Sequence, residues 1–433
     1  MTSPAGGRTR SAAEAHPARG TRELAFARPW AVRAAWIALG IAVLLVIVAS
    51  VVIRPLDFSV YRWGGHEVMH GLRLYLAQFT QGHNREWFTY PPFAAVLFVP
   101  IAALPYLVGA VIWQLISVLA LAVASLVTLK LAGYQPSRAV IAAVVTVGIA
   151  LEPVYHTLYL GQVNLILLAL ILVDVWRAAG RRPAGIGVGI AAAIKLTPLI
   201  FIALFLVTRR FRDALTAAGA FAACALIGYL VAPQASGLYW HHLFFDTSRV
   251  GAPYISNQSP YAAVLRIGGS DFHPGHWYLA IPAVLGIAGL IVAAVLARHD
   301  EWLGAATVMG TTALLVSPIS WTHHWVWILP ALAILVGGGR RARIAAALTF
   351  VLFVVAPMWF TPHDGGPQEY GFHWVITLLA NCYLIAGLAF LGYMAIRAYR
   401  IAGGGSLTSS EDRAGGQRAI VPAGPSMNPI RDR

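Results

Sequence analysis

Long apolar runs separated by short polar connectors make up most of the chain. A helix that crosses a bilayer needs about 20 apolar residues, and many of the runs approach or exceed that length. The pattern therefore predicts an all-α polytopic membrane protein with about 12 transmembrane segments. The runs lie at residues 33–53, 106–130, 138–153, 162–177, 184–208, 214–233, 277–298, 302–317, 324–337, 342–360 and 374–399.

The composition supports membrane insertion and argues against a soluble fold. Hydrophobic residues make up 58% of the 433 residues and charged residues only 11%, whereas soluble domains carry about 25% charged residues. The formal net charge of +14 would suit nucleic acid, but the basic residues stand between apolar runs and at the chain ends, as in membrane proteins. We therefore expect a lipid bilayer as a partner and no nucleic acid.

Clusters of arginine indicate which connectors face the cytoplasm, because positively charged connectors stay on that side of the membrane. The dense clusters lie at residues 177–182, 209–212, 340–343 and 397–400. We expect these clusters and both termini in the cytoplasm. Two large loops, 54–105 and 234–276, are then left on the outer side. Both mix aromatic, charged and amide residues, which is unusual for simple connectors.

The ends of the chain differ from its middle. Residues 1–28 and 402–433 are rich in glycine, serine, proline and charge, so we expect disordered cytoplasmic tails there. Residues 29–401 are expected to form one transmembrane domain. The first apolar run has no small-residue cleavage site before Arg54 and is interpreted as an uncleaved span.

Residues 184–208 begin and end at arginine clusters, so a single simple span does not fit them. Lys195-Leu196-Thr197-Pro198 stands in the middle, and proline breaks a helix because it lacks a backbone donor. We predict a broken hairpin of two half-length helices that meet at a polar apex, against protein or a water-filled cavity. Lysine at this apex, with the amides of the second half-helix, suits an oxyanion such as phosphate. Snorkelling to an interface is the alternative.

A shorter apolar stretch at residues 93–104 allows two interpretations. It forms either an interfacial or re-entrant helix before the span 106–130, or one of two short spans. The second interpretation would place Lys130 and Arg138 outside, so the charge rule favours the first.

Polar side chains on the expected outer side are the candidates for chemistry. Asp57 follows the first span directly, and a carboxylate near membrane depth is a functional candidate by default. A solvated loop aspartate, or an ion pair with Arg54 or Arg62, is the alternative. The connector at residues 152–164 supplies His156, Gln162 and Asn164, whose donors and acceptors suit sugar hydroxyls or phosphate. They would equally hold an interhelical turn.

Histidines stand in two further outer segments. His323 and His324, next to tryptophans, either bind phosphate or sugar or belong to an interfacial aromatic belt. His241 and His242 hint at a metal, but no carboxylate or cysteine stands at ligand spacing. We therefore expect no metal. The sequence contains no nucleotide-binding or P-loop motif, so we expect no cofactor and a lipid-borne substrate.

Six short motifs in order resemble glycosyltransferase family 87, a group of membrane glycosyltransferases of the GT-C type found in actinobacteria. The resemblance covers about residues 34–400 and no part of the tails. Each motif alone is weak, and the order of all six carries the resemblance. The motifs are Pro55-Leu56-Asp57-Phe58-Ser59-Val60-Tyr61, Tyr90-Pro91-Pro92, Gly161-Gln162-Val163-Asn164, Ala193-Ile194-Lys195-Leu196-Thr197-Pro198, Asn257-Gln258-Ser259 and Ser317-Pro318-Ile319-Ser320-Trp321-Thr322-His323-His324.

The resemblance implies α-(1→2) transfer of mannose from polyprenyl-phosphate mannose to a phosphatidylinositol mannoside, at the periplasmic face of the cytoplasmic membrane. A β-linked donor and an α-linked product imply inversion, and the family's acidic residue after the first span corresponds to Asp57 as the base. Lys195, His323 and His324 are expected at the donor phosphate. Tyr61, Arg62, Gln162, Asn164, Asn257 and Gln258 are expected to bind sugar or acceptor.

Two other functions fit parts of the pattern. A transporter or lipid flippase also has broken helices near the membrane midplane, but transporters commonly show internal repeats and none is visible here. A sister enzyme that branches lipomannan-type or lipoarabinomannan-type glycans, or transfers a pentofuranose, would share the chemistry.

Overall fold

The computed structural model describes residues 22–71, 73–244, 246 and 249–415, and this part is almost entirely helical. The α-helices are α1 Pro29–Ile53, α2 Leu56–Met69, α3 Pro92–Ala102, α4 Tyr106–Leu131, α5 Arg138–Ile149, α6 Glu152–Leu160, α7 Asn164–Ala179, α8 Ile186–Ile194, α9 Ile200–Val207, α10 Phe211–Val231, α11 Pro233–Leu238, α12 Pro260–Gly268, α13 Ala280–Arg298, α14 Trp302–Val316, α15 Ile328–Val336, α16 Arg340–Val355, α17 Trp374–Ala380 and α18 Cys382–Gly415. Short 3-10 or π turns are η1 Thr197–Leu199, η2 Tyr239–Leu243, η3 His276–Leu279, η4 Thr322–Trp327, η5 Pro357–Phe360 and η6 Pro367–Glu369.

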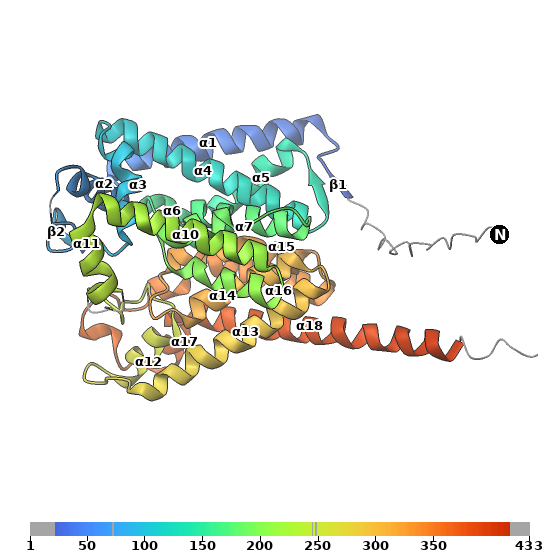
Figure 1. The fold of residues 1–433 in the computed structure, drawn as a ribbon. Helices are drawn as coiled ribbons and strands as arrows, with labels where there is room; N and C mark the ends of the chain where they lie inside the picture. Colours follow the sequence, from blue (N-terminus) through green and yellow to red (C-terminus); the bar gives the residue numbers. More distant parts are fainter. Residues whose placement is uncertain (1–21, 72, 245, 247–248, 416–433) are drawn as a thin grey trace, which may run out of the picture.

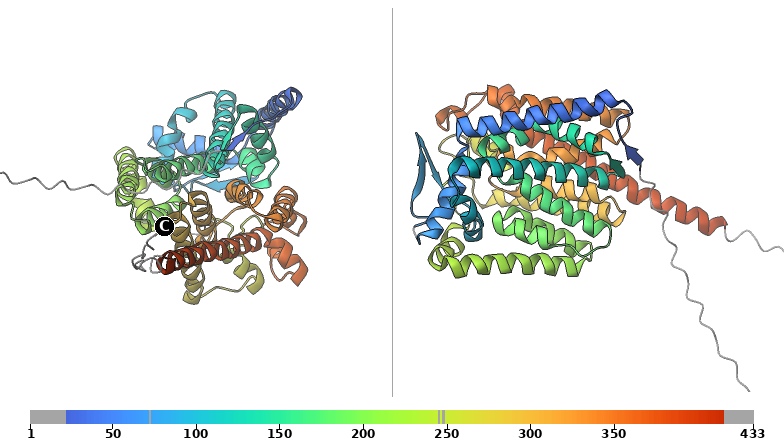
Figure 2. Two further views of the ribbon diagram at one scale, coloured as in Figure 1. Left: turned by 90° about the vertical axis from the view of Figure 1, so that its right-hand side faces the viewer. Right: turned by 90° about the horizontal axis from the view of Figure 1, so that it is seen from above.

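The long helices lie side by side and give the molecule two distinct ends (Figures 1 and 2). One end, which we call the loop end, carries α2, α3, α11, α12, α17 and the antiparallel hairpin of β2 (Gln78–Gln81) and β3 (Asn84–Trp87). The opposite end carries β1 (Arg22–Leu24), which pairs in parallel with β4 (Tyr134–Pro136), and the end of α18. The two large loops of the sequence therefore meet at one end of the bundle.

Five of the described helical segments are long and apolar enough to cross a membrane. They include α1, α4, α10, α13 together with η3, and α18. The pair α5 and α6, bent by 81° at its break, would add a sixth. The chain is thus a multi-pass membrane protein. Four more helical segments are apolar but shorter, so the expected count of about 12 segments stays a prediction.

Helix α14 forms the centre of the bundle. Nearly every one of its residues is buried, which is typical of a helix surrounded by other helices. It packs against α7, α9, α13 and α18. Its last residues lead through Ser317 into η4, so the histidines of η4 are carried on the best-packed helix of the molecule.

The predicted broken hairpin at residues 184–208 is present. Helix α8 ends at Lys195, whose extended backbone (φ −149°, ψ 128°) interrupts the helix before η1 and α9. The two ends of the hairpin meet, because the Ala184 amide donates to the Asp213 carboxylate at 3.0 Å and the Arg210 guanidinium donates to the Arg182 carbonyl at 3.2 Å. The apex with Lys195 therefore points away from both arginine clusters and into the bundle.

The short apolar stretch after the β2–β3 hairpin forms α3, which has 11 residues. At 1.5 Å per residue such a helix is about 16 Å long, roughly half of the hydrocarbon thickness. It packs against α2 and α10. The helix is too short for an ordinary span, and its interfacial or re-entrant placement stays a prediction.

The connector predicted at residues 152–164 contains a short helix, because residues 152–160 form α6. Pro153 in the first helical turn favours this start, and Gly161 in the left-handed region (φ 70°) ends the helix. The predicted tails fall mainly outside the described residues. In the described parts of these tails, Arg22–Leu24 forms β1, which pairs with β4, and α18 continues to Gly415.

The close packing of α8, the first half of the hairpin, on α10 can be tested by a substitution at Gly189. A Cβ atom at Gly189 would clash with the Ala217 carbonyl oxygen and the Ala220 side chain. Overpacking of this kind costs about 1–3 kcal/mol. Gly189→Ala is therefore expected to lower the Tm of the purified protein by several degrees in a thermal unfolding measurement.

Gly219 provides the matched control on α10 itself. No atom lies within 4 Å of a Cβ built there, so Gly219→Ala should leave the Tm unchanged or raise it slightly through higher helix propensity. Equal Tm values for Gly189→Ala and the wild type would contradict the close packing of α8 on α10.

Candidate active site

Asp57 lies in the first turn of α2, directly after the end of α1 at the loop end. An acidic side chain there interacts favourably with the helix dipole. Its carboxylate interacts with the side-chain amide of Gln162 and electrostatically with Lys195 and His156. The structure thus brings together four residues from three separate segments of the chain.

Burial raises the pKa of the Asp57 carboxyl from 3.8 to about 6. The hydrogen bond with Gln162 and the positive charge of Lys195 act in the opposite direction and limit the rise. A carboxylate whose pKa lies near the working pH is well suited to accept a proton, because it is ionised at neutral pH and still basic.

Gln162 joins Asp57 to two tyrosines. Its Oε1 atom accepts hydrogen bonds from the hydroxyls of Tyr61 at 2.8 Å and Tyr90 at 3.1 Å, and the two hydroxyls lie 2.9 Å apart. Because the phenols occupy the oxygen, the amide nitrogen of Gln162 is left to donate to Asp57. The three side chains are buried and hold the carboxylate in one orientation.

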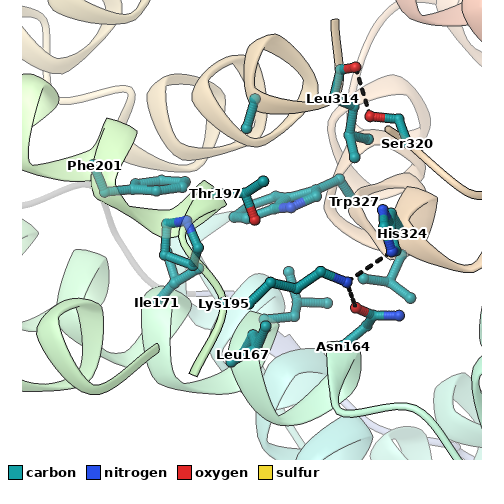
Figure 3. Close-up of a pocket in the computed structure, with 14 residues that line it drawn as sticks. Asn164, Leu167, Ile171, Lys195, Thr197, Phe201, Leu314, Ser320, His324 and Trp327 are labelled. Atoms are coloured by element: carbon teal, nitrogen blue, oxygen red, sulfur yellow. Dashed lines mark hydrogen bonds between the residues drawn. The ribbon is translucent and has the colours of Figure 1, made fainter. Parts of the chain in front are cut away.

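Lys195 supplies the positive charge of the site. Its Nζ atom lies 3.2 Å from Oδ1 of Asn164 and 2.7 Å from Nε2 of His324 (Figure 3). An ammonium group has only donors, so His324 accepts through Nε2 in this contact. Asn164 in turn donates from Nδ2 to the His323 carbonyl at 2.9 Å. The apex of the hairpin is thereby tied to α7 and η4.

These side chains lie at one end of a pocket between α7, α9, α14 and η4 (Figure 3). Lys195, Asn164 and His324 form its polar end. The remaining wall is mainly apolar, and its larger side chains are Leu167, Leu168, Ile171, Phe201, Val326 and Trp327. A pocket with a cationic end and an apolar wall suits an anionic group attached to a hydrocarbon chain.

His323 has no protein partner for its ring within the described part of the chain. Both ring nitrogens are buried without a hydrogen bond, although buried polar atoms are usually paired. The ring lies between those of His156 and His324, at centroid distances of 5.3 Å and 4.7 Å. It is therefore available to a bound molecule.

Three of the predicted binding residues lie away from this cluster. Arg62 donates to the Ile101 carbonyl and lies over the Tyr106 ring, on the α3–α4 side. The amides of Asn257 and Gln258 are fully buried and hydrogen-bonded to backbone groups of other segments. They connect the second loop to the segment between α14 and η4 and to α17 and α18, and their sugar-binding role stays a prediction.

Two carboxylates were not recognised from the sequence. Glu86 on β3 lies within electrostatic reach of Asp57, and burial followed by the Asp57 charge raises its pKa from 4.5 to about 7. Glu152 on α6 contacts His156. No local motif marks Glu86, because Asp57 comes from a distant segment. Glu152 stands four residues before His156 on α6, and this helical spacing could have pointed to the pair. Within the described residues, no group of three or more histidine, cysteine or acidic side chains is placed to hold a metal ion.

Comparison with known proteins assigns the chain to a family. The family model of Glycosyltransferase family 87 matches residues 88–318. A polyprenol-phosphate-mannose-dependent alpha-(1-2)-phosphatidylinositol mannoside mannosyltransferase of Mycobacterium tuberculosis (strain ATCC 25618 / H37Rv) is 35% identical over 72% of this chain and 78% of its own length. A polyprenol-phosphate-mannose-dependent alpha-(1-2)-phosphatidylinositol pentamannoside mannosyltransferase of Mycobacterium tuberculosis (strain CDC 1551 / Oshkosh) is 34% identical over 71% and 73%, respectively.

The chain is therefore a membrane-embedded glycosyltransferase. It belongs to glycosyltransferase family 87, which confirms the resemblance seen in its six motifs. No solved structure matches it.

The raised pKa of Asp57 predicts that its ionised carboxylate lowers the stability of the folded protein. The folded state binds the Asp57 proton more tightly than the unfolded state, so the contribution of this residue to stability is lost as the pH rises from about 4 to about 6. Asp57→Asn is expected to raise the Tm at pH 7.5, and the difference from wild type should vanish near pH 4. A Tm difference that is the same at both pH values would contradict the burial of an ionised carboxylate.

Proposed function

We propose that this protein transfers mannose from polyprenyl-phosphate mannose to a hydroxyl of a phosphatidylinositol mannoside, forming an α-(1→2) linkage with inversion at the anomeric carbon. The relatives carry this donor and this class of acceptor in their names. The observation that carries the proposal is the grouping of one carboxylate, Asp57, and one ammonium group, Lys195, beside an amphipathic pocket.

The two charges suit the two halves of an inverting transfer. Asp57 accepts the proton of the acceptor hydroxyl while the hydroxyl oxygen forms a bond to the anomeric carbon. The bond from that carbon to the phosphate oxygen breaks on the opposite side, and the phosphate leaves with the electron pair. Lys195, His323 and His324 stabilise its growing negative charge. Phosphate is already a good leaving group, so this reaction requires no general acid.

The pocket supports a lipid-linked donor. With the phosphate at Lys195, the first isoprene units of the donor would lie along the apolar wall that includes Ile171, Phe201 and Trp327. The polar cluster of Asp57, Tyr61 and Gln162 would then bind sugar hydroxyls on the other side of the ammonium group.

The distribution of charge supports a reaction at the outer face of the cytoplasmic membrane. Arg182 and Arg210, from two of the arginine clusters, are hydrogen-bonded to each other at the end of the hairpin opposite to its apex. Positively charged connectors face the cytoplasm, so the loop end with α2 would face the periplasm and both termini the cytoplasm.

Substitutions at the two charges test the proposed roles. With polyprenyl-phosphate mannose and a phosphatidylinositol tetramannoside, Asp57→Asn is expected to lower kcat by about 10²–10⁴-fold, because the general base is lost. Lys195→Met is expected to lower kcat/KM for the donor by about 10²–10³-fold through loss of charge stabilisation at the phosphate. Radiolabelled mannose in the lipid product measures both effects.

Different results would change different parts of the proposal. Full activity of Asp57→Asn would remove Asp57 as the base, and an unchanged response of Lys195→Met to the donor would make that lysine structural. If the wild type transfers no mannose to any mannoside acceptor, the mannosyltransferase proposal fails. Transfer to lipomannan-type glycans alone would replace the acceptor and keep the chemistry.

The pH dependence tests the state of Asp57 directly. Protonated Asp57 cannot accept the acceptor proton, so kcat/KM for the acceptor should be half-maximal near pH 6 and level off above about pH 7. The midpoint is obtained from initial rates between about pH 3 and about pH 8. A midpoint near pH 4, the value of an ordinary aspartate, would show that Asp57 is not buried in the working enzyme.

A further inference from the structure

The Glu152 carboxylate is a point where three segments meet. Its Oε1 atom accepts a hydrogen bond from Nε1 of Trp359 at 3.0 Å and lies 3.0 Å from Nδ1 of His156. Its Oε2 atom accepts from the Tyr383 hydroxyl at 3.0 Å. These partners belong to η5, α6 and α18, and only 7% of Glu152 is exposed.

A buried carboxylate with this set of partners is fixed in one orientation. Charge-assisted hydrogen bonds from tryptophan and tyrosine satisfy both carboxylate oxygens, and the position in the first turn of α6 adds a favourable interaction with the helix dipole. Desolvating a carboxylate is costly, and an apolar or amide residue would avoid the cost at a purely structural junction. The negative charge of Glu152 is therefore best explained by its effect on His156.

His156 connects this junction to the site described above. Its Nδ1 atom also lies 2.8 Å from Oγ1 of Thr322, the residue before His323. Its ring is perpendicular to that of His323 at a centroid distance of 5.3 Å, and it interacts electrostatically with Asp57. A ring that directs Nδ1 to Glu152 directs Nε2 to the other side, and within the described part of the chain no residue is hydrogen-bonded to that atom.

We propose that Glu152 is a positioning residue that holds His156 with its proton on Nδ1, so that the Nε2 lone pair accepts a hydrogen bond from a hydroxyl of a bound sugar. A carboxylate paired with a histidine fixes its tautomer and ring orientation and strengthens the other nitrogen as an acceptor. A hydroxyl fits this acceptor, whereas an ionised phosphate oxygen has no proton to donate. The inference rests on the proposed mannosyl transfer, and both donor and acceptor sugars carry such hydroxyls.

The pairing predicts how substitutions combine. Glu152→Gln keeps the size of the side chain and removes the charge, and it is expected to lower kcat/KM about 10–100-fold. His156→Gln should lower it at least as much. Because Glu152 acts through His156, the double variant should be no less active than His156→Gln alone, within about twofold. The full-length protein in detergent is assayed with polyprenyl-phosphate mannose and a phosphatidylinositol mannoside.

The two substrates distinguish the source of the hydroxyl. If the hydroxyl belongs to the transferred mannose, the loss in kcat/KM appears when the donor is varied. If it belongs to the acceptor, the loss appears when the acceptor is varied. Either result supports the inference, whereas activity of Glu152→Gln within twofold of wild type, or independent multiplicative losses in the double variant, would overturn it.

Asp174→Asn is the matched control, because it makes the same change from carboxylate to amide at a buried position away from the site. Asp174 on α7 accepts a hydrogen bond from the Val188 amide at 2.8 Å, next to the start of α8. This variant is expected to lower the Tm and to leave kcat and both KM values unchanged. If Asp174→Asn loses as much activity as Glu152→Gln does, the effect of Glu152→Gln would be structural and the positioning role would be contradicted.

A spectroscopic measurement keeps the inference separate from the proposed function. Nitrogen-15 spectra of histidine-labelled protein, with the His156 signals assigned through His156→Gln, report the tautomer without any turnover. The expected result is a protonated Nδ1 in the wild type and a changed signal in Glu152→Gln. A proton on Nε2 in the wild type would overturn the inference even if mannose is transferred, and an inactive wild type with a protonated Nδ1 would instead refute the proposed function.

Discussion

The positive charge of Lys195 at the apex of the broken hairpin is the constraint on which the site depends. An ammonium group inside the membrane-embedded part of a protein needs polar partners, because lipid offers none. Asn164 at the start of α7 and His324 on η4 provide them, and both belong to segments that meet the hairpin only in the folded chain. The need to satisfy one charge thus fixes the relative positions of α7, α8 and η4, and with them one side of the pocket.

The second side of the site is built around a charge of opposite sign. Asp57 and Lys195 attract each other, and neutral amides stand beside both of them. Gln162 directs its oxygen to two tyrosines and its nitrogen toward Asp57, whereas Asn164 directs its oxygen to Lys195. The two amides are separated by one residue at the junction of α6 and α7, so the end of one helix and the start of the next set the spacing between Asp57 and Lys195.

The sequence was informative where charge or proline left few solutions. Arginine clusters at both ends of residues 184–208 and proline at their centre predicted the hairpin, and the position of Asp57 after the first span marked it as a candidate. The helical spacing of Glu152 and His156 was readable, but the burial of Glu152 was not, because its other two partners, Trp359 and Tyr383, are more than 200 positions away. Asn257 has the residue type of a sugar ligand, but the structure uses its amide for backbone hydrogen bonds. Residue type alone does not distinguish these uses.

The contact between Lys195 and His324 has a consequence for the synthesis of the protein. The two residues are 129 positions apart. Ribosomes add about 5–20 residues per second, so His324 is made about 6–26 s after Lys195. The rest of the hairpin and Asn164 precede the histidine in the chain, so they are made before it. The ammonium group therefore needs water or Asn164 as its partner in the incomplete bundle, because lipid offers none.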